Sequence, residues 1–165
     1  MATVQLRPLS HEDGHLVHRL LQHIPAHENG FYNGANGLSY EEYKNWLLRK
    51  EEIRAGIGLC SDEVEESIYW LIVDGIPVGV GKIRHRLTPA LRIYGGSISY
   101  SIAAQYRNKG YGTMLLHMLL QEARQLRLTE LQLTTYNYNY ASQRVALKNG
   151  GICYNRTELR TYYKM

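Results

Sequence analysis

The stretch SISYSIAAQYRNKGYGT, residues 97–113, is the part of the chain from which the fold can be predicted. Ile98, Tyr100 and Ile102 alternate with small residues, and alternating β-branched and aromatic residues favour a β-strand. Gly110 and Gly112 follow in a short turn, and the run MLLHMLLQEARQL after them is typical of a helix. Unpaired N–H groups and the helix dipole at such a strand–turn–helix junction form a binding site for an anion.

The charges around this junction indicate a ligand that carries phosphate. Arg107 and Lys109 lie in the turn, and no carboxylate occurs from Leu87 through Gln121. The chain has no P-loop motif, and Leu115 stands where a dinucleotide-binding fingerprint needs its third glycine. A tight turn without a ligand remains the structural alternative.

Composition describes an ordinary globular chain of one domain, residues 1–165. Apolar residues make up 44% and charged residues 21%, and the net charge is +4. The two cysteines imply no disulfide framework, and neither a signal peptide nor a membrane-spanning stretch is present in the sequence. We therefore expect a cytoplasmic protein without membrane or nucleic-acid partners. The basic triplet at residues 84–86 is too small to indicate nucleic acid.

Periodicity and capping residues predict the other elements. Ser10 with Asp13, and Ser39 with Glu42, form capping patterns that begin two helices, and Asp74-Gly75 marks a hairpin turn. We read residues 25–37, 56–67 and 88–96 as loops, and the long first loop as functional. Expected strands cover residues 3–9, 67–73, 76–87, 97–102, about 131–133 and 152–164, and two further helices cover residues 113–126 and 141–148. This order predicts an α+β (mixed α/β) fold with a central mixed sheet flanked by about four helices.

The segment RNKGYG, residues 107–112, resembles the Arg/Gln-x-x-Gly-x-Gly/Ala signature of the GNAT family of N-acetyltransferases. The segment NYASQRVALKNGG, residues 139–151, is similar to the second cofactor segment of that family, and the order of elements matches its fold along nearly the whole chain. The resemblance extends to a bacterial subgroup of predicted acetyltransferases through the segments VGVGKIRHRL, residues 78–87, and YGGSISYSI, residues 94–102.

The resemblance implies acetyl-CoA as co-substrate and assigns a role to each segment. Backbone N–H groups of residues 107–112 would hold the pyrophosphate, and Thr113 would start the helix. The end of the strand would bind the pantetheine amides, and the N–H near Ile102 would polarise the thioester carbonyl. Asn139 would contact the pantetheine arm, although an N-cap is its plain structural role. The predicted cofactor-binding residues are Tyr100, Ser101, Ile102, Arg107, Asn108, Lys109, Gly110, Tyr111, Gly112, Thr113, Asn139 and Ser142.

The catalytic residues are less well defined by the sequence. The family often has a tyrosine seven residues after the asparagine, as acid for the leaving thiolate, and here that position is Ala146. Tyr140 is a nearby substitute, on a run where Tyr136 and Tyr138 alternate with it. Glu28 and His85 are candidate bases for the attacking amine. Ordinary packing or solvent exposure is the alternative for all three candidates.

These observations predict an acetyl-CoA-dependent N-acetyltransferase in which a primary amine attacks the thioester directly. We expect the acceptor, a small molecule or peptide, over the first two helices and residues 25–37, where Phe31 and Tyr32 lie. A non-catalytic acyl-CoA-binding sensor or interaction module is the alternative, and an unrelated phosphate-ligand enzyme is a third. No metal is expected, because the spaced histidines of the first helix lack a further ligand. Monomer and homodimer both stay open.

Overall fold

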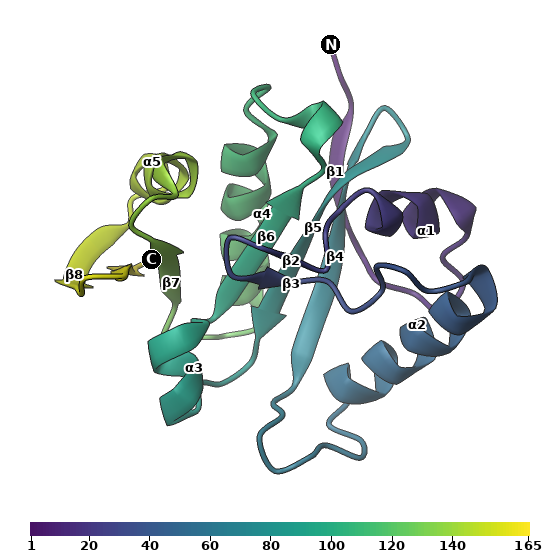
Figure 1. Ribbon diagram of the computed structural model, residues 1–165, viewed down its shortest axis with the longest axis horizontal. Coiled ribbons are helices and arrows are strands. Elements are labelled where there is room, and N and C mark those ends of the chain that lie inside the picture. Colours follow the sequence, from purple (N-terminus) through teal and green to yellow (C-terminus); the bar gives the residue numbers. More distant parts are fainter.

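The structure, a computed structural model, describes residues 1–165 and contains nine strands, five α-helices and one short 3-10 helix (Figure 1). The strands are β1 (Val4–Pro8), β2 (His27–Glu28), β3 (Phe31–Tyr32), β4 (Glu66–Val73), β5 (Ile76–Arg84), β6 (Ile98–Ile102), β7 (Gln132–Tyr136), β8 (Ile152–Arg156) and β9 (Arg160–Lys164). The helices are α1 (His15–Gln22), α2 (Tyr40–Arg54), α3 (Pro89–Tyr94), α4 (Tyr111–Gln125) and α5 (Tyr140–Lys148), with the 3-10 helix at Ala104–Tyr106.

The first sheet has four antiparallel strands in the order β1-β4-β5-β6. β4 lies inside it because its apolar run is buried on both faces, with only the first residue partly exposed. Asp74 and Gly75 turn the chain into β5 with φ angles of 48° and 79°, the left-handed conformation that a tight hairpin requires. This confirms the hairpin that the sequence predicts here.

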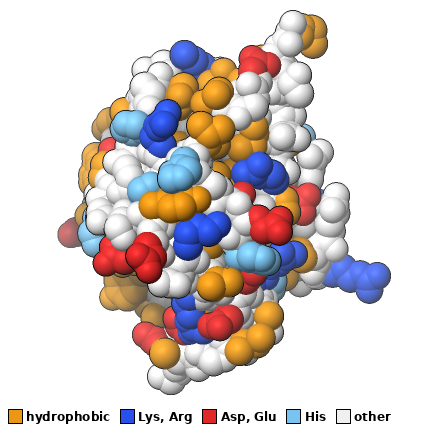
Figure 2. Space-filling view, turned by 90° about the vertical axis from the view of Figure 1, so that its right-hand side faces the viewer, with side chains coloured by type: hydrophobic (Ala, Val, Ile, Leu, Met, Phe, Trp, Pro, Cys, Tyr) orange, Lys and Arg blue, Asp and Glu red, His pale blue; other side chains and the backbone are white.

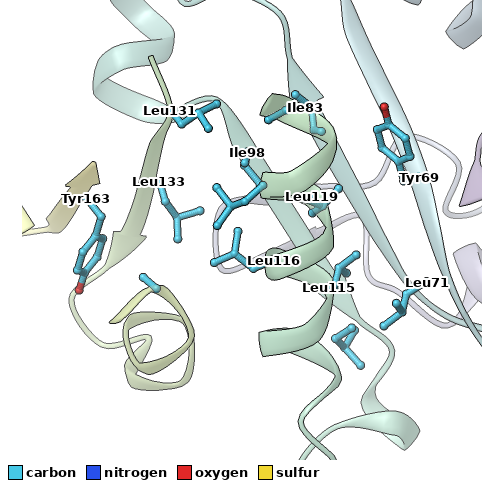
Figure 3. Close-up of a cluster of buried hydrophobic side chains, with 14 of the residues drawn as sticks. Tyr69, Leu71, Ile83, Ile98, Leu115, Leu116, Leu119, Leu131, Leu133 and Tyr163 are labelled. Carbon is cyan, nitrogen blue, oxygen red and sulfur yellow. The ribbon is translucent and has the colours of Figure 1, made fainter. Parts of the chain in front are cut away.

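The second sheet, in the order β7-β9-β8, is joined to the first through a shared core. Figure 3 shows Leu116 and Leu119 of α4 in one cluster with Ile98 of β6 and Leu133 of β7. α4 approaches β5 closely because Gly81 has no side chain, and a Cβ there would lie 2.5 Å from Leu119 Cδ1. One helix therefore fills the space under both sheets.

The opposite face of the first sheet is covered by α1 and α2, which bury a second core around Trp70 (Figure 1). Asp13 lies in this core with three donors, because its carboxylate accepts from Trp70 Nε1 (2.7 Å), from the Ser10 N–H (2.8 Å) and from Arg7 (2.8 Å). A buried carboxylate is tolerated when its oxygens are satisfied in this way. The network fixes the start of α1 to the sheet.

The surface that carries α1 and α2 mixes side chains of both charges with histidines (Figure 2). Each of the three histidines spaced along this segment has a partner of its own. His11 Nδ1 lies 3.0 Å from Glu51, His15 stacks on Tyr40 with ring centroids 3.8 Å apart, and His18 Nε2 lies 2.8 Å from the carbonyl of Leu38. The three rings do not converge on one point.

The two sheets meet at one end only. Ser97 N–H donates to the Gln132 carbonyl at 2.8 Å, and a single bridge joins Gly96 to Leu133. No ladder joins the rest of β6 to β7, so the two strands belong to separate sheets. The end of β6 therefore has an open edge on the side of β7.

Four local predictions were wrong in detail. α1 begins at His15 with Gly14 as N-cap rather than after Ser10. Thr88 caps the short helix α3 where a loop was predicted, and Pro89 at its first position favours that start. The long loop of residues 25–37 contains the hairpin β2–β3. The sheet, predicted as one mixed sheet, is two sheets whose ladders are all antiparallel.

None of the helices is both long and apolar enough to cross a membrane.

Candidate functional site

A cavity of about 300 Å³ opens at the end of β6, between the start of α4 and the exposed face of α5. Its walls come from four segments that are far apart in sequence. They are Glu28 and Asn29 of the β2–β3 turn; Tyr100, Ser101 and Ile102 of β6; Tyr106, Arg107, Asn108, Gly110, Tyr111, Gly112 and Thr113; and Asn139, Ala141, Ser142, Arg144, Val145 and Lys148 of α5 and its cap.

The start of α4 presents unpaired N–H groups to this cavity. The helix begins at Tyr111, two residues before the predicted start at Thr113, and its N-cap Gly110 has a φ of 80°. The first bond within the helix runs from Met114 N–H to the Gly110 carbonyl at 3.1 Å, and no side chain caps the turn. The N–H groups of Tyr111, Gly112 and Thr113 are therefore free to bind an anion.

The turn has room for a ligand against its backbone. A Cβ at Gly110 would have no atom within 4 Å, so the space beside this residue is open. Asn108 also has a positive φ, of 61°, and the left-handed conformation is one that asparagine adopts more readily than most residues. The chain between Arg107 and the helix is thus a tight, exposed loop around an empty space.

The charges that line the cavity are mainly positive. Arg107, Arg144 and Lys148 stand against one carboxylate, that of Glu28. Arg107 Nε donates to the Ile102 carbonyl at 2.9 Å, and its guanidinium also forms an ion pair with Glu28. Lys109 does not line the cavity, and its ammonium lies over the ring of Tyr106. The arrangement can bind a polyanion such as a pyrophosphate.

The register of β6 determines which of its backbone groups face the opening. Arg84 N–H donates to the Ser97 carbonyl and Ala103 N–H donates to the Val78 carbonyl, so the odd-numbered residues of β6 pair with β5. In an antiparallel ladder the alternate residues point their N–H and C=O groups away from that partner. The N–H and C=O of Tyr100 and the N–H of Ile102 therefore face the gap toward β7, where an extended ligand can pair with them.

Side chains from β6 and α5 meet at the base of the gap. The Tyr100 hydroxyl donates to Ser142 Oγ at 3.3 Å, and burial raises the pKa of Tyr100 to about 12. Asn139 is the N-cap of α5, because its Oδ1 accepts from the Ser142 N–H at 3.3 Å, and it also lines the cavity. Asn139 is therefore both the N-cap of α5 and part of the cavity wall, and the two roles are compatible.

A second, smaller cavity of about 50 Å³ continues from the first into the space between β6 and β7. The two cavities share Asn29, Tyr100, Asn139 and Ser142. The β2–β3 hairpin closes it on the side of α1 and α2, and Figure 1 shows this hairpin crossing in front of β6. The space along β6 thus continues beneath the hairpin.

Three contacts hold the hairpin over the gap. Glu28 is bound to Arg107, and a Cβ at Gly30 would lie 3.2 Å from the ring of Tyr136. Beneath the hairpin, Lys82 Nζ donates to the Tyr32 carbonyl at 2.6 Å and lies 4.7 Å from the centroid of the Phe31 ring. Burial lowers the pKa of Lys82 to about 8, and Glu66 partly opposes that shift.

Replacing Lys82 should change the pH dependence of stability. The unfolded chain holds the Lys82 proton up to its ordinary pKa near 10.5, but the folded chain holds it only below about 8. The unfolded state binds more protons in that window, so the free energy of unfolding rises with pH, by about 2–3 kcal/mol between pH 8 and 10. In urea unfolding measurements between pH 8 and 10, Lys82→Met should lack this rise of about 2–3 kcal/mol in the free energy of unfolding. The exposed Lys164→Met is the control, and equal slopes in wild type and Lys82→Met would contradict the prediction.

The three predicted catalytic candidates lie in different places. Glu28 lines the first cavity and is the only carboxylate in either. His85 follows β5 at the opposite end of the sheet from Ile102, with its ring 2.8 Å from Ser67 Oγ, so it is not near the gap. Tyr140 is exposed and lines neither cavity, because β7 ends at Tyr136 and the alternation does not continue. His85 and Tyr140 therefore lie outside the two cavities.

Several cavity residues were missed from the sequence. Arg144, Val145 and Lys148 line the first cavity from α5, and Ala146 faces the buried core instead. Helical spacing from Ala141 gives this face, so the signal was present. Arg160 and Tyr94 line the second cavity and come from β9 and α3. No local pattern connects those two residues to the site.

This fold and site define an α+β domain in which an anion-binding helix start lies beside the open edge of a strand. A sequence model described as the acetyltransferase (GNAT) domain matches residues 3–152. The chain therefore belongs to the GNAT family of acetyltransferases, and it is an acetyl-CoA-dependent N-acetyltransferase. The resemblance, fold class and reaction class predicted from the sequence are confirmed.

Solved structures show the same fold. RimL, an alpha-N-protein acetyltransferase of a ribosomal protein solved with coenzyme A, has a TM-score of 0.71 at 16% identity, over 99% of this chain and 93% of RimL. A ribosomal-protein-alanine acetyltransferase from Vibrio fischeri also has a TM-score of 0.71, at 12% identity, over 98% and 92% of the two chains. The Campylobacter jejuni N-acetyltransferase PseH in complex with acetyl coenzyme A has 0.62 at 14%, over 99% and 98%. Comparison with curated protein sequences gives no match.

Proposed function

We propose that the first cavity binds acetyl-CoA and that the gap between β6 and β7 is where the acetyl group reacts. The single observation that carries this proposal is the row of free N–H groups at Tyr111, Gly112 and Thr113, beside the open space at Gly110. These groups and Arg107 would hold the pyrophosphate, while Arg144 and Lys148 add positive charge. RimL and PseH, which were solved with coenzyme A and with acetyl coenzyme A, support the choice of ligand.

The pantetheine arm would pair with β6 as an added strand. The free N–H of Ile102, nearest to the start of α4, would pair with a pantetheine amide, and the N–H of Tyr100, further along the strand, would donate to the thioester carbonyl. Such a donor stabilises the negative charge that develops on that oxygen when the carbonyl carbon is attacked. Asn139 and Ser142 would contact the arm from α5.

The reaction needs one proton to be removed from the acceptor. The amine nitrogen attacks the thioester carbon, the C–S bond breaks, and the products are the amide and CoA. An alkyl ammonium has a pKa near ~10.4 in water, whereas a thiol has one near ~8.5, so the thiolate can leave without a dedicated acid. This agrees with Ala146 at the position where the family often has a tyrosine.

Glu28 is the group that we assign as proton acceptor. Arg107 bonds to both Glu28 and the Ile102 carbonyl, so the carboxylate lies beside the last residues of β6, in the cavity that Tyr100 also lines. It belongs to the hairpin that separates the cavity from the α1–α2 side. The acceptor is a primary amine of a small molecule or peptide that enters under this hairpin. RimL acts on a ribosomal protein, which makes a peptide N-terminus one candidate.

We propose that residues 1–165 form a single catalytic domain, because one core passes beneath both sheets. We also propose that this domain works in the cytoplasm, as a monomer or a homodimer.

Two measurements test the proposed function. Calorimetric titration should show acetyl-CoA and CoA binding at tens of micromolar or tighter. Thiol release from acetyl-CoA should then accelerate in the presence of one class in an amine panel of amino acids, peptides and small polyamines. Absence of binding would contradict both the enzyme and the acyl-CoA-binding alternative. Binding without thiol release for any amine would favour the non-catalytic module.

A further inference from the structure

Arg160, at the start of β9, is the only charged side chain that lines the second cavity. The rest of the lining is aromatic, aliphatic, hydroxyl, amide and glycine, and it contains no carboxylate. In the proposed reaction this cavity is the approach of the acceptor. The composition of its wall therefore bears on which amines can enter.

The guanidinium of Arg160 lies between two tyrosines. Its Cζ is 4.7 Å from the ring centroid of Tyr136 and 5.3 Å from that of Tyr94, and one nitrogen donates to the Tyr136 hydroxyl at 3.1 Å. Two aromatic rings restrict a planar cation to few orientations. The side chain is thus held in place by neutral neighbours.

The charge of Arg160 is not neutralised by the protein. Arg160 takes part in none of the eight ion pairs. The other two partly buried arginines are both paired, Arg49 with Glu52 and Glu63 and Arg84 with Glu66 at 3.5 Å. Of the five N–H donors of a guanidinium, the side chain of Arg160 uses one in a hydrogen bond to the protein. A fixed, partly buried guanidinium with unused donors is suited to a planar or tetrahedral oxyanion.

We propose that the acceptor carries an oxyanion group, a carboxylate or a phosphate, on the same molecule as the reacting amine, and that Arg160 binds it. This inference rests on the proposed function, because it takes the second cavity as the acceptor entrance. The amine would lie at the junction of the two cavities, near Tyr100 and Asn29. The anion would lie within the second cavity, beside Arg160 at the start of β9. Arg160 is then a specificity residue, since it contacts substrate away from the reacting atoms.

The test compares matched amines that differ only in charge. β-Alanine and β-alaninamide separate a carboxylate from its neutral amide, and O-phosphoethanolamine and ethanolamine do the same for a phosphate. For at least one of the two pairs, the wild-type protein should acetylate the anionic amine with a kcat/KM at least tenfold higher than that of the neutral amine. Arg160→Gln should abolish that preference, while leaving the neutral amines and the affinity for acetyl-CoA unchanged.

A control substitution at a second arginine tests whether the preference depends on Arg160 itself or on the net charge of the protein. Arg156 on β8 lies outside both cavities, and Arg156→Gln should keep the wild-type preference. A preference that survives Arg160→Gln, or that is absent from wild type, would overturn the inference while leaving acetyl transfer itself intact.

A binding measurement keeps the inference testable if none of these amines is acetylated. N-Acetyl-β-alanine and N-acetyl-β-alaninamide are the products of the first pair, and they can be titrated into CoA-loaded protein at millimolar concentration by NMR. Wild type should bind the carboxylate at least tenfold more tightly than the amide, and Arg160→Gln should bind the two alike. Equal binding by wild type would contradict the anion site, whatever the outcome of the transfer assay.

Discussion

Gly110→Asp should weaken the binding of acetyl-CoA by two to three orders of magnitude. Gly110 lies at the open N-terminus of α4, where an added side chain meets no atom within 4 Å and projects into the space proposed for the pyrophosphate. Two negative charges about 4 Å apart repel each other by roughly 4 kcal/mol at the effective dielectric near a protein surface. Calorimetric titration of acetyl-CoA measures the loss directly.

Gly110→Asn is the matched control for this substitution. Asparagine has nearly the same size as aspartate and carries no charge, and both tolerate the left-handed φ of 80° at a cost of about 1 kcal/mol. We expect Gly110→Asn to lose less than about tenfold in affinity. Equal losses in the two variants would indicate that filled space rather than charge matters. Unchanged affinity in a folded Gly110→Asp protein would mean that the anion binds elsewhere.

Glu28→Gln should lower kcat by about a hundredfold and leave the dissociation constant of acetyl-CoA within about threefold. Glutamine cannot take the proton of the amine, and general-base catalysis typically contributes 10²–10⁴-fold. The amide oxygen of glutamine can still accept from Arg107, so the loop around Arg107 should keep its conformation. Steady-state kinetics with the best amine of the panel, together with calorimetry, separates the two quantities.

The opposite pattern would give Glu28 another role. If acetyl-CoA binding weakened and kcat stayed constant, Glu28 would be a positioning residue for Arg107 and not the base. Glu12 is an exposed glutamate outside both cavities, and Glu12→Gln should change neither value. Because the two outcomes differ in kcat and in affinity, one set of measurements decides between them.

The strand, turn and helix start that line the first cavity could be predicted because they are local in sequence. A strand, a glycine turn and a helix start within residues 97–113 place the N–H groups, the cations and the open edge next to one another. Backbone conformation in such a unit depends on a few adjacent residues, chiefly Gly110. The hairpin turn at Asp74-Gly75 and the cap at Ser39 were predictable for the same reason.

The errors at element boundaries came from contacts that no local pattern contains. Ser10 and Asp13 form a capping pattern, but Asp13 also binds Trp70 and Arg7, and the helix starts only after Gly14. The helix α3 is the exception, because Thr88 and Pro89 carry a helix-start signal within the local sequence. His85 was chosen for its type, and only the strand register shows that it lies at the far end of the sheet.

The amino-acid sequence was enough to establish the family and the fold class and to predict an anion-binding junction at residues 97–113. The tertiary structure was needed to show that Glu28 meets Arg107, that the β2–β3 hairpin lies over the gap, and that Arg160 from β9 lines the second cavity. Glu28 and Arg160 are more than a hundred residues apart in the sequence. The segments that carry them are held together by the core that α4 buries beneath both sheets. The hydrophobic effect has no preferred direction. An apolar sequence pattern therefore predicts that a helix or strand face is buried, but not which distant side chains it contacts.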